Sequence, residues 1–491
     1  MDFNHFLQHP KNKIQVINPV GGAYAEQSPV LVISGAPGVE EARTHPYLHH
    51  VVHRGTTDTQ RRIFSEICIE TGELNSTRTA CQEITKVLDA MMAWSLPGYI
   101  EVPRDKITRL LSSPMPSYHP EKNITDLDKL SDLHRSHGLE VLDWMRKCSR
   151  PVVLAGVEVQ RFGLQHMLLS ILAREGWSCA TSLSGKSLLG ETNPHFLGIY
   201  NGAMSMENVK RQVEESDGIL VIGAHNADLD TGIWTVNLDL NKTVYVDMKV
   251  GLIWRAGTNS DILNTVSLLK VWMEADPPQT LCPRRPSLAP KKHEPFQAKH
   301  DERITIRRLV EAVGNVVDEN TVILADPGDA LFSAADIHVP FPNQFLTSGF
   351  WASLGFALPA SLGAYYSNPE SNRPIVIVGD GAFLMCATEL ATLVRYNVPS
   401  LIIILDNKGY NTERPMLDGS FNDVHPVNHV ALATSFGIKR AKRVVTEIEF
   451  WTCLQEFSRE TSAPSLISVS IDPSDMSDAL KHLTAALKKS V

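Results

Sequence analysis

The chain has 491 residues, a net charge of −9 and a composition that is 43% hydrophobic and 21% charged. These values are typical of a globular protein of about two to four domains, and the mixed charges exclude a basic surface for nucleic acid. No apolar run reaches the roughly 18–20 residues that a membrane span needs, and the first residues lack the apolar core of a secretory signal. Scattered cysteines without a CxxC pair favour reduced thiols. We therefore expect a cytoplasmic protein without membrane or nucleic-acid partners.

Buried strands alternate with helical patterns in three segments, which predicts an α/β fold of three doubly wound parallel-sheet domains. The first domain is placed at residues 1–105, the central domain at 133–275 and the third at 303–491. The polar stretch at 112–132 and the proline-, lysine- and arginine-rich stretch at 276–302 are interpreted as linkers.

The third domain contains one βαβ unit in which both strands end at polar residues. The first strand ends at Gly379-Asp380-Gly381, a helix is expected over about 382–396, and the next strand ends at Asp406-Asn407. Such a crossover returns the chain parallel to itself, so both strand ends lie at the edge where open α/β sheets bind ligands. We therefore expect Asp380 and Asn407 to face one small volume.

The residue types at these two strand ends suit a hard cation with a diphosphate. A carboxylate, an amide oxygen and a backbone carbonyl are ligands of the kind that Mg²⁺ prefers. Glycines let the backbone approach phosphates, and the start of the following helix favours an anion. Gly-Asp-Gly alone is a common turn, but the second strand end, followed by Lys408-Gly409-Tyr410-Asn411, favours a magnesium-diphosphate site.

The two motifs together resemble those of thiamine diphosphate enzymes. The segment Asp406–Glu413 is similar to the pyruvate and indolepyruvate decarboxylase branch, and the resemblance runs from about residue 19 to the end of the sequence. It implies a pyrimidine-binding, a central and a diphosphate-binding domain, in that order. It also implies thiamine diphosphate and Mg²⁺ as cofactors, with the metal held by Asp380, Asn407 and the carbonyl of Gly409.

The resemblance assigns further residues to the cofactor. Leu354 would force thiamine into its bent conformer, and the carbonyl of Ala352 would accept a hydrogen bond from its aminopyrimidine. Without the motif, a core leucine would be the simpler interpretation of Leu354. The cofactor-binding residues that the resemblance implies are Asp329, Ala352, Ser353, Leu354, Gly379, Asp380, Gly381, Ala382, Asn407, Gly409, Tyr410 and Asn411.

Three residues are candidates for acid–base catalysis. Glu413 closely follows Asn407, and a carboxyl with a raised pKa suits proton delivery to the carbon that loses carbon dioxide. The alternative is a solvated loop glutamate paired with Arg414. His49 and His50 match an adjacent histidine pair of the decarboxylase branch, and neutral imidazoles can shuttle protons near pH 7. A surface cluster is the alternative, because the chain has 18 histidines.

The resemblance implies a carbon–carbon lyase that converts a small-molecule 2-oxo acid of the pyruvate, indolepyruvate or phenylpyruvate class to an aldehyde and carbon dioxide. It also implies a homodimer or homotetramer. Carboligation is one alternative. A catalytically impaired binding or regulatory paralogue is another, because residues 1–18 do not resemble the family region that carries an activating glutamate, and we expect a truncated first domain. Glu26 belongs to a later segment and is not assigned to that role.

Overall fold

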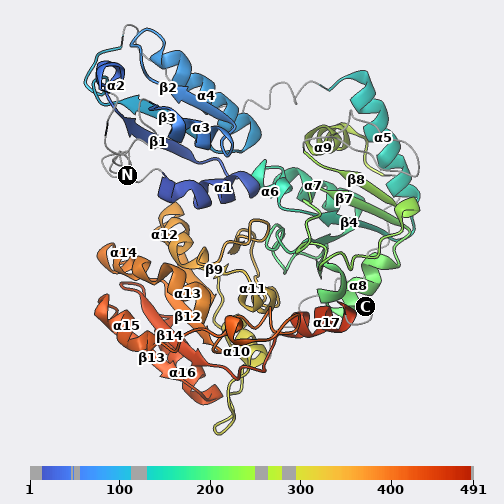
Figure 1. The fold of residues 1–491 in the computed structure, drawn as a ribbon. Helices are drawn as coiled ribbons and strands as arrows, with labels where there is room; N and C mark the ends of the chain where they lie inside the picture. The colour runs from blue at the N-terminus through green and yellow to red at the C-terminus, as the bar shows by residue number, and fades with distance from the viewer. Residues whose placement is uncertain are drawn as a thin grey trace. The chain divides into compact units, whose positions relative to one another are not determined.

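Figure 1 shows the computed structural model of the chain, which describes residues 14–45, 48, 56–111, 130–248, 264–278 and 295–487. The chain divides into two compact units, Met1–Leu130 and Ser131–Val491. Within the described ranges, no helix is both long and apolar enough to cross a membrane.

The first unit contains a parallel sheet with the strand order β1-β3-β2. In its core, the ring of Phe64 stacks on Tyr99 of the middle strand, with 4.6 Å between the ring centroids. The predicted histidine pair, His49 and His50, lies outside the described residues. The elements of this unit are η3 (Ile14–Val16), α1 (Ile17–Ala25), β1 (Leu31–Ala36), α2 (Val39–Thr44), α3 (Thr59–Ser65), β2 (Glu70–Glu73), α4 (Ala80–Trp94) and β3 (Gly98–Pro103).

The second unit contains two parallel sheets, of which the central sheet has the strand order β6-β5-β4-β7-β8. Its three inner strands, β5, β4 and β7, are buried along their whole length, as expected for a sheet covered by helices on both faces. Its elements are α5 (Asp132–Lys147), β4 (Pro151–Ala155), α6 (Glu158–Arg161), α7 (Gln165–Glu175), β5 (Ser178–Thr181), β6 (Phe196–Ile199), η4 (Gly202–Met204), α8 (Glu207–Glu214), β7 (Gly218–Ile222), η5 (Leu240–Lys242), β8 (Thr243–Val246) and α9 (Thr265–Glu274).

The C-terminal sheet of this unit has the strand order β10-β9-β11-β12-β14-β13, again with parallel pairing throughout. Its elements are α10 (Ile306–Gly314), β9 (Thr321–Ala325), α11 (Asp329–Ala334), β10 (Phe345–Thr347), α12 (Ala357–Ser367), β11 (Arg373–Gly379), α13 (Asp380–Cys386), η6 (Ala387–Glu389), α14 (Leu390–Arg395), β12 (Leu401–Asp406), η7 (Ser420–Asn422), α15 (His429–Ser435), β13 (Arg440–Val444), α16 (Glu447–Phe457), β14 (Ser465–Ser470) and α17 (Asp478–Leu487).

Three sheets of parallel strands, with helices between the strands in sequence, confirm the predicted fold class. The domain boundaries stay a prediction. The helix expected over 382–396 differs in detail, because α13 begins at Asp380 and the stretch is divided into α13, η6 and α14. An acidic residue is favoured in the first turn of a helix, which explains the earlier start. The division falls at Cys386, whose backbone leaves the helical region at φ −130°.

Hydrogen bonds join the central and C-terminal sheets of the second unit. The Lys186 ammonium donates to the carbonyl of Ile337 at 2.9 Å and forms an ion pair with Glu191. The backbone N–H of Glu191 donates to Val339 at 3.0 Å. Lys186 is 2% exposed, so this contact is shielded from water. Loops of the central sheet can therefore line a cavity together with the C-terminal sheet.

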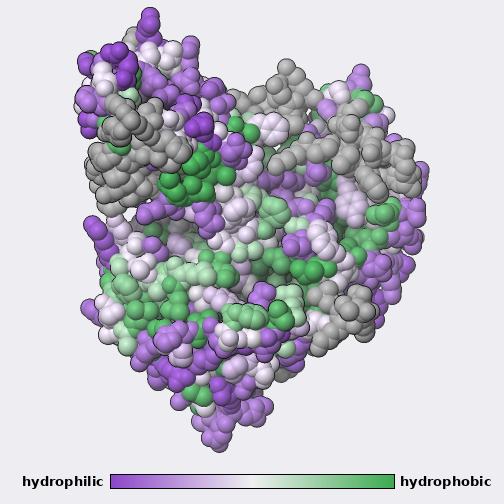
Figure 2. Space-filling model, viewed as in Figure 1, coloured by the Kyte–Doolittle hydropathy of each residue, from purple (hydrophilic) through white to green (hydrophobic). Residues whose placement is uncertain are grey.

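Hydrophobic residues gather on one face of the second unit, over the region of α13 and α14 (Figure 2). Met385 of α13 is 60% exposed and Trp351 is 45% exposed. Contiguous exposed apolar surface on a folded protein often marks an interaction site.

Candidate functional site

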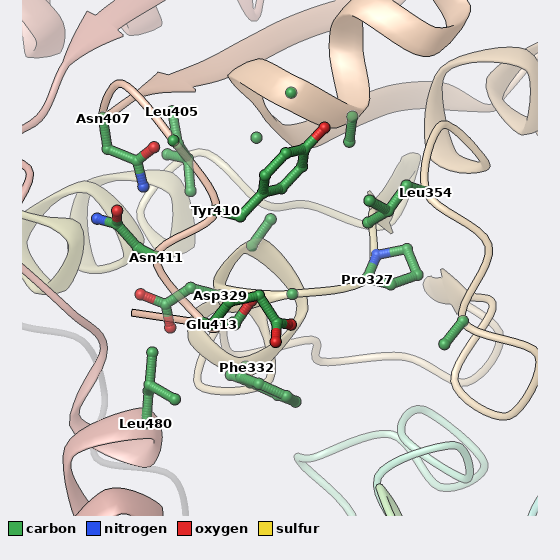
Figure 3. A pocket seen from close by; sticks show the side chains of 18 of the residues that line it. Pro327, Asp329, Phe332, Leu354, Leu405, Asn407, Tyr410, Asn411, Glu413 and Leu480 are labelled. Carbon is green, nitrogen blue, oxygen red and sulfur yellow. The ribbon is translucent and has the colours of Figure 1, made fainter. Parts of the chain in front are cut away.

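A cavity of about 440 Å³ lies at the carboxyl ends of β9, β11 and β12 (Figure 3). Its position agrees with the rule that open α/β sheets bind ligands at this edge. The residues that line it are Leu229, Ile233, Pro327, Gly328, Asp329, Ala330, Phe332, Ala352, Leu354, Gly379, Asp380, Gly381, Ala382, Leu405, Asn407, Gly409, Tyr410, Asn411, Thr412, Glu413, Met416, Leu480, Leu483 and Thr484. Most residues assigned from the sequence are therefore brought together, whereas Ser353 is not among the lining residues.

Asp380 connects the ends of β11 and β12. One carboxylate oxygen accepts from the backbone N–H of Gly381 at 2.8 Å, and the other accepts from that of Lys408 at 2.7 Å. The side chain is buried, and burial raises the pKa of Asp380 to about 6. A cation beside this carboxylate would favour its ionised form.

The loop after β12 offers two further oxygen atoms to the cavity. Asn407 is 5% exposed, and its Oδ1 has no hydrogen-bond partner among the described residues. The carbonyl of Gly409 accepts one hydrogen bond, from the N–H of Asn411 at 3.1 Å, which leaves its second lone pair for another partner. A buried amide oxygen without a partner is costly, so a ligand at this position would stabilise it.

The glycine turn is shaped by the side chain of Tyr410. A Cβ atom on Gly381 would lie 2.6 Å from Cε1 of the Tyr410 ring, so a larger residue would force this ring to move. Gly379 has open space where a Cβ would be, and Ala382 adds only a methyl group. The backbone of the turn is therefore open to close approach by a ligand.

The segment before α12 brings Ala352 and Leu354 to the cavity. Ala352 has a left-handed backbone with φ 54°, and Gly355 follows with φ 85°. Asp326, at the end of β9, accepts hydrogen bonds of 2.9 Å from the N–H groups of Gly355 and Ala357. Our sequence reasoning missed Asp326, although its place directly after a buried strand is a signal of the same kind as Asp380.

Two acidic side chains lie on the side of the cavity lined by Phe332 and Leu480 (Figure 3). Asp329 is buried, and burial raises its pKa. Its Oδ2 accepts from the N–H of Ser477 at 3.0 Å, whereas its Oδ1 has no hydrogen-bond partner among the described residues. Glu413 is exposed at the cavity. Both carboxyls could therefore meet a bound molecule.

Two hydrogen-bond networks fix the loop that carries Glu413. Arg414, the alternative partner of Glu413, donates to Asp418 at 2.7 Å and to Asp423 at 2.8 Å. Asn411 donates to the carbonyl of Pro473 at 2.8 Å and is itself bonded by Arg414. The side-chain amide of Asn411 thus forms hydrogen bonds that hold the loop. Its position in the cavity lining agrees with the predicted cofactor contact, but these bonds are made within the protein.

The apolar side of the cavity comes from residues that the sequence did not reveal. Leu229 and Ile233 belong to the central sheet's loops, and Leu480 and Leu483 belong to α17. Nothing in the local pattern marks them, because they are ordinary aliphatic residues far from the Gly-Asp-Gly motif in sequence. The cavity therefore has the metal-type oxygen atoms at β11 and β12, and at α11 and α17 it has apolar side chains next to the carboxyls of Asp329 and Glu413.

Family models match two parts of the chain. The model of the thiamine pyrophosphate enzyme central domain matches residues 139–253, and that of the C-terminal TPP binding domain matches residues 326–469. Indole-3-pyruvate decarboxylase of Azospirillum brasilense is 31% identical over 479 residues, which cover 96% of this chain and 84% of that protein. The chain belongs to the thiamine pyrophosphate-dependent 2-oxo acid decarboxylase family.

Two further decarboxylases are similar to this chain over most of its length. The alpha-keto-acid decarboxylase of Mycobacterium leprae (strain TN) is 30% identical over 407 residues, or 82% of this chain and 69% of that protein. That of Mycolicibacterium paratuberculosis is 27% identical over 473 residues, or 93% of this chain and 80% of that protein. The similarity therefore extends well beyond the two segments that the family models match.

The cavity of this decarboxylase-family chain fits the diphosphate of thiamine pyrophosphate. The buried Asn407 Oδ1 lacks a partner among the described residues, and the turn around Gly381 exposes backbone rather than large side chains. Carboxylate, amide and carbonyl oxygens are a donor set for a hard divalent cation. The apolar side chains of the lining, among them Leu354 and Phe332, suit the rings of the cofactor and the substrate's side chain.

Proposed function

We propose that the chain removes carbon dioxide from a 2-oxo acid and releases an aldehyde, with thiamine diphosphate held through Mg²⁺. The observation that carries this proposal is the single cavity that brings together Asp380, Asn407 and Glu413. Oxygen donors for a metal lie at one end, and an exposed carboxyl lies on its wall. The names of the relatives, which are decarboxylases of indole-3-pyruvate or alpha-keto acids, support the same reaction type.

Mg²⁺ would take one oxygen each from the Asp380 carboxylate, the Asn407 amide and the Gly409 carbonyl. Its remaining positions would be filled by diphosphate oxygens and water. The described residues contain no group of three or more histidine, cysteine or acidic side chains that could hold a metal. The proposal therefore requires a mixed site, in which one carboxylate acts together with amide, backbone and phosphate oxygens.

Thiamine diphosphate, when bound, accepts the negative charge that the departing carbon dioxide leaves behind. Glu413 would then deliver a proton to the carbon atom that has lost carbon dioxide. Leu354 would hold thiamine in its bent conformer, and the Ala352 carbonyl would orient the aminopyrimidine. His49 and His50 remain predicted substrate-side residues, and the assignment of Ser353 has no support from the cavity lining.

We also propose that copies of the chain associate in a dimer or tetramer. Met416, which lines the cavity, is 67% exposed, and Phe421 in the same loop is 64% exposed. Exposed apolar side chains beside a cavity are stabilised when a second surface covers them. A cytoplasmic location is proposed on the cysteines, because no disulfide links those in the described part of the chain.

Aldehyde formation tests the reaction directly. Purified chain would be incubated with Mg²⁺, thiamine diphosphate and either pyruvate, phenylpyruvate or indolepyruvate, and the aldehyde would be measured beside a reaction without the cofactor. We expect cofactor-dependent aldehyde from at least one substrate. Cofactor binding by calorimetry without any aldehyde would overturn the decarboxylase assignment and favour a binding or regulatory role.

A further inference from the structure

The central sheet has a cavity of its own, of about 290 Å³, at the carboxyl ends of its strands. The order β6-β5-β4-β7-β8 reverses its direction of winding between β4 and β7. Ligands of open α/β sheets bind outside the carboxyl ends at such a point. Leu154 of β4 and Ala224 just after β7 both line the cavity, as do Ser182, Tyr200 and Tyr245 from the ends of the other strands.

A loop covers this cavity with an exposed aromatic side chain. The loop contributes Asn226, Asp230, Thr231, Trp234, Val236 and Leu238 to the lining. Trp234 is 69% exposed, whereas Tyr200 is 1% exposed and donates from its hydroxyl to Glu214 at 2.9 Å. The cavity thus has a buried aromatic wall and a tryptophan at its outer side. Aromatic rings on two sides favour a ligand with a flat face.

The backbone at Trp234 is held in a costly conformation. Ile233 and Trp234 have φ values of 53° and 63°, a left-handed region that β-branched and bulky residues rarely adopt. Hydrogen bonds maintain the turn, from the Ile233 N–H to Asp228 at 2.7 Å and from the Thr235 hydroxyl to the carbonyl of Gly232 at 2.6 Å. Strained residues that the surroundings hold in place are concentrated at ligand clamps and active sites.

The polar groups that line the cavity indicate which ligand charge it can accommodate. No lysine, arginine or histidine is among the described residues that line it, and Asp230 contributes a carboxylate. Asp230 accepts from the N–H and the hydroxyl of Ser184 at 2.8 Å and 2.6 Å. A phosphate or carboxylate would therefore meet a negative charge without a compensating cation. This chemistry disfavours nucleotides, the cofactor diphosphate and the 2-oxo acid itself.

We propose that this cavity binds a small, uncharged aromatic compound, whose ring lies against Trp234. The site is separate from the cofactor cavity, although Ile233, the neighbour of Trp234, lines that cavity. The proposal goes beyond decarboxylation and does not depend on it.

The test is a calorimetric titration of the full chain with indole, carried out with and without Mg²⁺ and thiamine diphosphate. Trp234→Phe keeps an aromatic face and should bind indole with little change. Trp234→Gly should weaken binding by about tenfold or more, because it removes the ring contact. Trp94→Ala is the matched control, since Trp94 is also exposed, at 42%, but belongs to the first unit.

Thermal melting separates binding from folding in this experiment. Glycine adopts a φ of 63° without strain, so Trp234→Gly should not lower the melting temperature while it weakens indole binding. Indole-3-acetate should bind more weakly than indole because of its carboxylate. The proposal is overturned if indole does not bind, if Trp234→Gly binds it as tightly as the unchanged chain, or if indole-3-acetate binds better than indole.

Discussion

The carboxylate of Asp326 accepts a hydrogen bond of 2.9 Å from the backbone N–H of Gly355. Its other oxygen accepts from the N–H of Ala357, also at 2.9 Å. These bonds fix the start of α12 and the turn before it, which carries Ala352 and Leu354 to the cofactor cavity. Asp326 is fully buried, so water cannot replace it. An acid outside the cavity lining thus sets the position of residues that form it.

Asp326→Asn should weaken thiamine diphosphate binding by about tenfold, because one amide oxygen cannot serve both N–H groups and an unsatisfied buried N–H costs about 1–3 kcal/mol. Calorimetry with Mg²⁺ present measures the affinity. Ser361→Ala is the control, because Ser361 lies in the same helix and bonds Ser400 instead. Unchanged affinity in Asp326→Asn, with only a lower melting temperature, would contradict the positioning role.

The same carboxyl should make stability depend on pH. Burial raises the pKa of Asp326 from its ordinary 3.8 to about 6. At pH values between these two pKa values, the Asp326 carboxyl is protonated in the folded chain and ionised in the unfolded chain. The folded state therefore becomes less stable as the pH rises through this window. The difference corresponds to about 3 kcal/mol.

Denaturant unfolding of the unchanged chain and Asp326→Asn at several pH values measures this contribution. The unchanged chain should gain stability relative to the variant as the pH falls from about 7 to about 4. Asp380, whose pKa burial also raises to about 6, is present in both proteins, so its contribution cancels in the comparison. Parallel pH profiles would show that Asp326 does not titrate in this window.

The part of the cavity at β11 and β12 was predictable because its residues follow buried strands directly. A run such as Ile402–Leu405 identifies a strand, and the parallel crossover then places Asp380 and Asn407 at one edge. The position of Asn407 can therefore be predicted from this rule alone, without knowledge of how the sheets pack. Asp326 also directly follows a buried strand, so the same rule could have predicted its position at this edge.

The apolar side chains of the lining could not be predicted in this way. Ile233 reaches the cavity through a left-handed turn of the central sheet, and Leu480 reaches it from the last helix of the chain. Contacts between elements so distant in sequence depend on how sheets pack, which no local pattern encodes. Ser353, which lies between Ala352 and Leu354, is not among the lining residues, and its assignment stays a prediction.

Asn407→Ala should weaken the joint binding of Mg²⁺ and thiamine diphosphate by more than about tenfold. Loss of a residue that only hydrogen-bonds a metal ligand already lowers metal affinity by about tenfold or more, and Asn407 is proposed to be a ligand itself. The cofactor at about 100 times its Kd should stabilise the unchanged chain by about 2.7 kcal/mol, and removal of Mg²⁺ by a chelator should abolish this gain. Melting with and without the cofactor measures both effects. Asn372→Ala, which removes bonds to Ala364 and Ser367 away from the cavity, should keep the gain.

Gly381→Ala should lower cofactor affinity through Tyr410. The added methyl would lie 2.6 Å from the ring of Tyr410, which lines the cavity and must move. Gly363→Ala is the matched control, because Gly363 lies in α12 and a methyl group added there would meet nothing within 4 Å. The control should keep affinity and gain up to about 1 kcal/mol of stability, as alanine is the better helix residue. If Gly381→Ala and Gly363→Ala bound thiamine diphosphate equally well, the cofactor would not approach the backbone closely at Gly381.

Glu413→Gln should separate cofactor binding from turnover. Glutamine keeps the shape of the side chain but cannot deliver a proton, so kcat should fall by about 100-fold or more. Cofactor affinity should stay unchanged, because Glu413 is exposed and the metal oxygens come from other residues. Glu370→Gln, at another exposed glutamate, is the control for a general charge effect. Aldehyde formation gives kcat and calorimetry gives the affinity. Full activity in Glu413→Gln would remove this residue from the reaction, whereas a loss of affinity would make it a binding residue.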